Sequence, residues 1–181
     1  RVILENDTNY TSYVPDDYFT KEVVEYYSSN YFTGNTLSIG GTSENLFGYD
    51  PAEGWFDNVF SLGQTRVKTI SSENVFDNGL NATFKAVVIG ASNYASIIND
   101  HHLQVQVGTQ TLDTIYEGYK KIDIGMTIPV SELSSTPIDV NFISINDLGS
   151  AVDRQTVSYI QLKYPHSTDL GAVDLFDNFY V

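Results

Sequence analysis

Strict alternation of apolar and polar residues is the feature that most constrains the fold of this chain. Leu103, Val105 and Val107 alternate with glutamines, and the segment 122–128 repeats the same period with isoleucines and a methionine. A period of two residues places every apolar side chain on one face of a β-strand. Strands of this kind are typical of antiparallel sheets that have one face in water.

Other segments extend this pattern along the chain. The mostly apolar run 83–89 is typical of a central strand. In 138–145 and 157–164 the apolar phase slips by one residue, which indicates a β-bulge or a strand buried on both faces. Gly108 separates two strands and indicates a tight hairpin. About seven or eight strands at this spacing predict an all-β fold, an antiparallel β-sandwich with a jelly-roll-like arrangement.

The N-terminal third differs from the rest of the chain in its residue pattern, and we predict a short helix within it. Thr20 is placed to cap a helix over Lys21–Ser29, with Glu22 and Glu25 near its positive end. A strand is the competing interpretation, because the same segment is rich in valine and tyrosine.

The chain divides into three parts on these patterns. The segment 1–48 is predicted to be extended or helical and to pack on the sandwich, 49–165 to form the β-sandwich, and 166–181 to exit toward a following domain. Val173–Val181 has the pattern of another strand, so we expect the natural chain to continue. A length of 181 residues is sufficient to bury a core without metals or disulfides.

Composition excludes several classes of function. The chain has no cysteine, which removes disulfides, a cysteine nucleophile and cysteine–zinc sites. The net charge is -14, whereas a nucleic-acid surface needs a basic stripe and anionic lipid repels an acidic one. No apolar run approaches the roughly 20 residues of a membrane span. We therefore expect neither a nucleic-acid partner nor membrane insertion.

Acidic loops are the candidate cation sites. Asp50, Glu53 and Asp57 lie close together in sequence, and Asp147 and Asp153 form a second acidic loop. Carboxylate oxygens suit calcium, so calcium is the cation that such loops would take. The spacing differs from that of an EF-hand, and a solvated loop is the competing interpretation. Apart from calcium, we expect no cofactor.

The pair His101–His102 is a poor metal site, because adjacent residues of a strand point to opposite faces. We expect one histidine to point inward toward a hydrogen-bond partner and the other to point outward. Paired carboxylates can also hydrolyse glycosides, but the acidic residues are too numerous for proximity in sequence to identify such a pair. No Gly-x-Ser-x-Gly segment is present.

Trp55 is the only tryptophan. Phe56, Val59 and Phe60 follow it closely, so we expect Trp55 to anchor the core where the chain enters the sandwich. The alternative is an exposed Trp55 that stacks on a sugar ring, as in carbohydrate-binding modules.

Four motifs, taken in order, resemble a known family. They are Pro51–Phe56 (PAEGWF), His101–Gly108 (HHLQVQVG), Tyr116–Tyr119 (YEGY) and Val157–Pro165 (VSYIQLKYP). This order is similar to that of the β-sandwich preceding the catalytic domain in gingipain-like cysteine peptidases, which include the type IX secretion-system sortase of Bacteroidetes.

The chain departs from the pattern of that family at three points. Tyr116 stands in place of the Trp of the family's x-x-Gly segment, His166 stands where it usually has Arg, and Gly108-Thr109 replaces its Asn-Gly turn.

The resemblance covers roughly Tyr49 to Pro165 and implies a secreted or cell-surface parent protein. The catalytic His and Cys of the family lie in a domain that this chain lacks, so the resemblance implies that the chain is not itself an enzyme. Its implied role is that of a non-catalytic accessory domain that packs against or positions a neighbouring catalytic domain of the same polypeptide. A carbohydrate-binding module with exposed Trp and Tyr is the first alternative, and a small hydrolase is the second.

Overall fold

The computed structural model describes residues 17–39, 42–45, 48, 50–133 and 136–168. Within these residues the chain is almost entirely β, and the helical part is one short 3-10 turn, Val130–Leu133. The predicted strand at Val173–Val181 lies outside the described residues.

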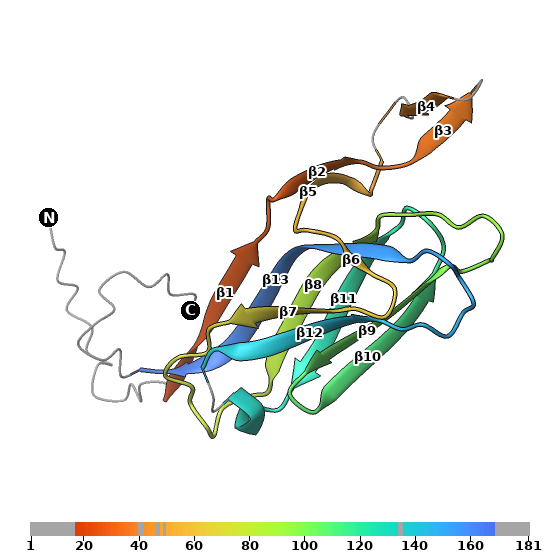
Figure 1. Ribbon diagram of the computed structural model, residues 1–181. Coiled ribbons are helices and arrows are strands. Elements are labelled where there is room, and N and C mark those ends of the chain that lie inside the picture. Colours follow the sequence, from red (N-terminus) through yellow and green to blue (C-terminus); the bar gives the residue numbers. More distant parts are fainter. Residues whose placement is uncertain (1–16, 40–41, 46–47, 49, 134–135, 169–181) are drawn as a thin grey trace, which may run out of the picture.

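Two antiparallel sheets form the body of the protein (Figure 1). The strands of the first sheet are, in spatial order, β1 (Tyr18–Tyr26), β13 (Arg154–Ser167), β8 (Ala82–Gly90) and β11 (Lys121–Ile128), with the short β6 (Phe60–Ser61) also paired to β13. Those of the second sheet are β10 (Gln110–Tyr116), β9 (His101–Val107), β12 (Ile138–Ser144) and β7 (Thr65–Ile70).

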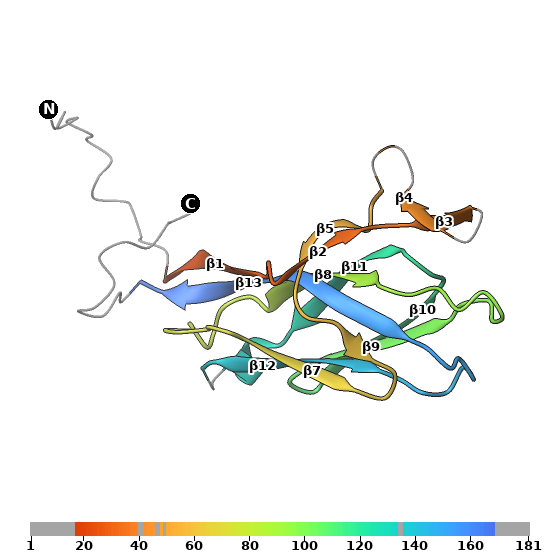
Figure 2. The same ribbon diagram turned by 45° about the horizontal axis from the view of Figure 1, so that its top comes forward.

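The path of the chain between the two sheets is that of a jelly roll. Figure 2 shows the sheets as two layers. From β1 the chain passes to β7 in the second sheet, returns to β8, forms the β9–β10 hairpin, returns to β11, crosses to β12 and ends in β13 beside β1. The predicted all-β sandwich with a jelly-roll-like arrangement is therefore confirmed.

The core lies between the two sheets, where the alternating strands place their apolar faces. In β9, Leu103, Val105 and Val107 are buried, while Gln104 and Gln106 point outward. The largest fully buried apolar side chains come from both sheets: Phe60, Ile70, Phe84, Leu103, Ile128, Leu133, Phe142, Ile160, Leu162 and Tyr164.

The segment predicted to be a helix, Lys21–Ser29, is instead mostly strand. β1 pairs with β13 along its whole length, with Val23 opposite Leu162. Because β13 offers a complete edge, pairing satisfies the backbone of this segment, and its valines and tyrosines suit a strand better than a helix. β1 is a strand of the first sheet, so this part of the segment 1–48 belongs to the sandwich itself.

The two predicted phase slips have different origins. In β12 the register against β9 is regular through Ile143, so no bulge is present. Ser144 takes the buried position there, which puts the apolar Ile143 on the outer face. In β13 the register against β8 shifts between Val157 and Tyr159, as a β-bulge predicts.

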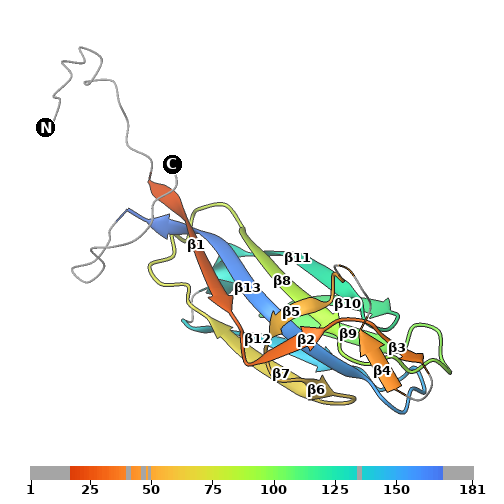
Figure 3. The same cartoon turned by 90° about the horizontal axis from the view of Figure 1, so that it is seen from above.

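A narrow ribbon leaves the sandwich between β1 and β6. Its root is the pair β2 (Asn30–Thr33) and β5 (Glu53–Phe56), and its tip is a second pair, β3 (Thr36–Ile39) and β4 (Thr42–Asn45). A small apolar cluster fixes the root to the outer side of the first sheet, with Ala52, Phe56 and Ile89 as its buried residues and Phe32 and Tyr119 packed against them. Viewed from above, the ribbon continues from the end of β1 (Figure 3).

Phe84 tests the position of the core. It is fully buried in β8 and paired with both β11 and β13. We expect Phe84→Ala to lower the free energy of unfolding by about 3–5 kcal/mol, because it removes a ring and leaves a cavity. Leu80→Ala, at a position 74% exposed, is the control and is expected to change it by less than about 0.5 kcal/mol. Urea unfolding measures both, and equal effects would contradict this core.

Candidate functional site

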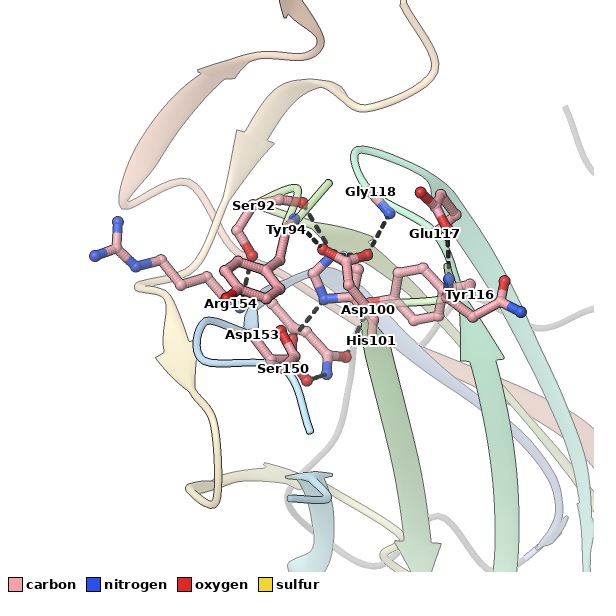
Figure 4. Close-up of polar contacts among 12 residues, drawn as sticks. Ser92, Tyr94, Asp100, His101, Tyr116, Glu117, Gly118, Ser150, Asp153 and Arg154 are labelled. Atoms are coloured by element: carbon pink, nitrogen blue, oxygen red, sulfur yellow. Dashed lines mark hydrogen bonds and ion pairs between the residues drawn. The ribbon is translucent and has the colours of Figure 1, made fainter. Parts of the chain in front are cut away.

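Two regions hold side chains with functional chemistry: a buried polar network at one end of the sandwich and an aromatic cleft at the root of the ribbon. The network is centred on His101, the first residue of β9, which is fully buried (Figure 4). Its Nδ1 lies 2.5 Å from Asp153 Oδ1, and its Nε2 lies 3.0 Å from the Ser92 carbonyl oxygen. Both partners accept hydrogen bonds and donate none, so both ring nitrogens carry hydrogen and the imidazole is a buried cation.

The two buried carboxylates beside His101 use their remaining oxygens to hold the surrounding loops. Asp153 Oδ2 accepts from Ser144 Oγ at 2.7 Å and from Gln155 Nε2 at 2.9 Å. Asp100 accepts from the backbone N–H of Gly118 at 2.7 Å and of Tyr94 at 2.5 Å. The network thus joins β9, β12 and β13 to the loop between β8 and β9, which holds Tyr94, and to the turn between β10 and β11, which holds Gly118.

Charge on His101 follows from these partners. Burial alone would lower the pKa of His101, but the hydrogen bond and charge of Asp153, the Ser92 carbonyl and the charge of Asp100 outweigh burial and raise it. A cation between two carboxylates stabilises a buried site only while all three members are present. The imidazole has no access to solvent and both nitrogens are bonded, so the arrangement is structural and offers no free base.

Tyr116 belongs to the same network. It is buried at the end of β10, its ring stacks on His101 with centroids 4.7 Å apart, and its hydroxyl donates to Gln155 Oε1 at 2.9 Å. Burial, followed by the charges of Asp153 and Asp100, raises the pKa of Tyr116 well above its ordinary value. Tyr116, a residue of the third family-like motif, is therefore part of the buried core.

A glycine at position 90 permits the close approach of the loops over His101. A Cβ placed on Gly90 would lie 2.0 Å from the Gly118 carbonyl oxygen and 2.8 Å from His101 Nε2. Gly90 is the last residue of β8, so its missing side chain lets a strand, a loop and the buried histidine meet at one point.

Trp55 is not the core anchor that its apolar neighbours predicted. It is 58% exposed, whereas Phe56 beside it is buried. The side chains of β5 alternate, and Phe56 takes the inward position against Ala52 and Ile89. The apolar partners therefore belong to Phe56 and Phe60, and Trp55 is left on the outer face.

A cleft of about 510 Å³ opens beside Trp55. Its lining residues come from the end of β1 and the turn after it, from β5 and from the bulge of β13: Tyr26, Tyr27, Ser28, Trp55 and Ser158. The bulge matters because Ser158 accepts the Tyr27 N–H at 2.8 Å through its carbonyl and donates its hydroxyl to the Trp55 carbonyl at 3.3 Å. Irregular backbone thus brings three distant segments together.

The aromatic rings of the cleft are braced by their neighbours. Tyr31 meets Trp55 edge to face at 5.5 Å, and its hydroxyl donates to Glu53. Tyr159 contacts Tyr26 at 5.9 Å, and Lys68 Nζ lies 4.0 Å above the ring of Tyr27. Each ring of the cleft thus contacts a neighbour outside it, and Tyr26 remains 76% exposed.

The predicted calcium ligands Asp50, Glu53 and Asp57 each have different partners. Asp50 is buried and accepts from Asn35 and from the Ala52 N–H, and these hydrogen bonds outweigh burial to lower its pKa. Glu53 accepts from Tyr31, and Asp57 pairs with Lys68 at 2.6 Å.

In the second acidic loop, Asp153 is in the His101 network and Asp147 contacts His102. The described residues hold no group of three or more His, Asp or Glu side chains placed to share a metal ion.

The predicted division of the two histidines is what the structure shows: His101 points inward, and His102 lies between Asp147 and Asp113 near the surface. The partners of His101 could not be read from the sequence, because Asp153 and Asp100 lie in loops without a periodic pattern.

Across the part of the chain that the structure describes, no helix is long and apolar enough to cross a bilayer.

Comparison with known proteins gives a likeness at the level of the fold. No protein-family model matches the sequence, and no curated protein matches it. Among solved structures, dimeric latent PorU from Porphyromonas gingivalis is similar to this chain with a TM-score of 0.53 and 11% sequence identity. The match covers 84% of this chain and 13% of that one. At this identity the likeness shows the fold alone: an all-β sandwich of this kind forms a small part of PorU.

Protonation of His101 makes the stability of the protein depend on pH. Because its pKa is raised in the folded state, its contribution is complete below about pH 6.5, the ordinary value of histidine, and is lost as pH rises through the folded pKa. Urea unfolding is expected to show stability falling above pH 6.5 in the wild type and in His102→Gln, but less steeply in His101→Gln. If His101→Gln does not fold, NMR titration of the wild-type ring decides, and a pKa below 6.5 would refute the buried cation.

Gly90 and Gly125 form a matched pair of strand glycines. A Cβ on Gly90 would overlap the Gly118 carbonyl, whereas a Cβ on Gly125 in β11 would meet nothing within 4 Å. We expect Gly90→Ala to lower the free energy of unfolding by about 2 kcal/mol or more through overpacking. Gly125→Ala is expected to be neutral or stabilising by up to about 1 kcal/mol. Equal melting temperatures for the two variants would contradict the close approach at Gly90.

Proposed function

We propose that this chain is a non-catalytic accessory β-sandwich of a larger exported, peptidase-like protein, and that it packs against a neighbouring domain of the same polypeptide. The observation that carries the proposal is the asymmetry of the structural likeness: 84% of this chain corresponds to only 13% of PorU. A sandwich of this fold therefore occurs as one module within a much longer chain. The order of the four sequence motifs supports the same family.

The side chains of the described residues agree with a role that needs no chemistry. The chain has no cysteine, so a cysteine nucleophile would have to come from another domain. His101, the histidine of the buried polar network, is bonded at both ring nitrogens and buried. The proposal therefore assigns no cofactor, nucleic acid or inserted membrane segment to this chain, and it places the parent protein outside the cell or at its surface.

The tip of the ribbon is the surface that we assign to the neighbouring domain. β3 and β4 form a two-stranded sheet of their own, separate from the two sheets of the sandwich. A two-stranded ribbon is marginally stable in water, and its outer edges carry backbone groups that a further strand can pair with. Contact with another domain would add packing to this two-stranded ribbon.

The root of the ribbon is packed on the first sheet by the Phe56 cluster. A root that is already packed loses less motion when a partner binds, which lowers the entropic cost of docking. The acidic surface of the chain, with a net charge of -14, favours a partner face that carries basic residues.

Hydrogen exchange on the natural polypeptide that contains these residues tests the proposal. Backbone amides of 36–45 are expected to exchange more slowly in the longer polypeptide than in the 181-residue chain, because the neighbouring domain covers the ribbon tip. The amides of β10, at the far edge of the second sheet, are the control and are expected to exchange equally in both. A reading frame without a further domain, or unchanged exchange at 36–45, would overturn the proposal.

A further inference from the structure

We propose that the cleft at the root of the ribbon is a binding site for a neutral glycan. The cleft is formed by Tyr26, Tyr27, Ser28, Trp55 and Ser158 and measures about 510 Å³, within the range of small-molecule sites. It lies at the root of the ribbon and not at the tip, so this site is independent of the docking surface proposed above.

Exposed aromatic rings are the first argument. Tyr26 is 76% exposed and Trp55 is 58% exposed, although large aromatic side chains ordinarily bury most of their area. Each of the two rings has an aromatic neighbour outside the cleft: Tyr159 lies 5.9 Å from Tyr26, and Tyr31 lies 5.5 Å from Trp55, centroid to centroid. A sugar ring presents an apolar face of C–H groups, and a rigid aromatic ring is the side chain that this face packs against at low entropic cost.

Hydroxyl groups are the second argument. Ser28 and Ser158 line the same cleft as the aromatic rings, and hydroxyls both donate and accept. Burial, followed by the charges of Glu25 and Asp57, raises the pKa of Tyr27 to about 12, so its phenol stays protonated at neutral pH. Apolar faces beside uncharged hydroxyls match the two sides of a hexose, which is apolar across the ring and polar around its rim.

Charge determines the class of glycan. No lining residue of the cleft is charged, and the nearby cation, Lys68, is already paired with Asp57 at 2.6 Å. Glu25 and Glu53 lie next to lining residues, and the chain as a whole carries -14. A uronic acid or sulfated sugar would meet repulsion in this setting, whereas a neutral sugar would not.

The backbone of the cleft argues against an extended peptide as the occupant. Peptides gain affinity by adding main-chain hydrogen bonds to an open strand edge. Here the Tyr27 N–H is bonded to the Ser158 carbonyl, and the Trp55 carbonyl accepts from the Ser158 hydroxyl. The floor of the cleft is therefore already paired, and what remains for a ligand is the aromatic faces, the Ser28 hydroxyl and the acceptor side of the Ser158 hydroxyl.

Fluorescence of Trp55 tests the site directly, because it is the only tryptophan and therefore the source of the whole signal. The probes are maltohexaose, cellohexaose, mannohexaose and xylohexaose, each titrated to millimolar concentration into the intact chain, with hexagalacturonate as the acidic counterpart. The expected result is a saturable blue shift with at least one neutral oligosaccharide and none with hexagalacturonate.

Tyr26→Ala is the decisive variant, since it keeps the reporter and removes one ring. It is expected to weaken binding about tenfold or more, while Leu80→Ala, at a similarly exposed position before β8 that does not line the cleft, leaves binding unchanged. Absence of saturation with all four neutral probes overturns the proposal, as does equal binding by Tyr26→Ala and the wild type, or equal binding of the acidic probe. Such a failure would leave the docking of the ribbon tip unaffected.

Discussion

The first sheet, the buried polar network and the aromatic cleft all depend on β13. This strand of 14 residues pairs with β1 on one side and with β8 on the other, and its first residues also pair with β6. Asp153, immediately before it, holds the buried His101, and Ser158 in its bulge forms the floor of the aromatic cleft. The same strand therefore closes the jelly roll, anchors the polar network and shapes the candidate binding surface.

The buried polar network and the root of the ribbon are stabilised by different physics. At the His101 end, a cation lies between two carboxylates that also hold backbone N–H groups and hydroxyls, so loops with little apolar surface are fixed by hydrogen bonds. At the ribbon root, Phe56 and its neighbours supply ordinary apolar packing. The bulge in β13 interrupts the ladder between these regions, and the interruption turns Ser158 toward the turn after β1.

The alternation of apolar and polar residues predicted the fold class, because a period of two survives in every strand that has one buried face. It failed where tertiary pairing decided the outcome: Tyr18–Tyr26 has a plausible helix cap, but the open edge of β13 makes it a strand. It failed again at Trp55, because proximity to apolar residues in sequence does not say which of two adjacent strand residues points inward. Tyr116 was identified from its motif, whereas its hydrogen bond to Gln155, and the bond from Gln155 to Asp153, required the folded structure.

The enclosed polar groups serve the fold, and the function that we propose therefore lies in the surfaces of the sandwich. The most direct measurement of this claim is a structure of the natural polypeptide that contains these residues, determined by cryo-electron microscopy or crystallography. The account predicts that the β3–β4 tip contacts a separate domain while the cleft beside Trp55 remains open. A β3–β4 tip surrounded only by solvent, or a polypeptide with no domain beyond this sandwich, would contradict it.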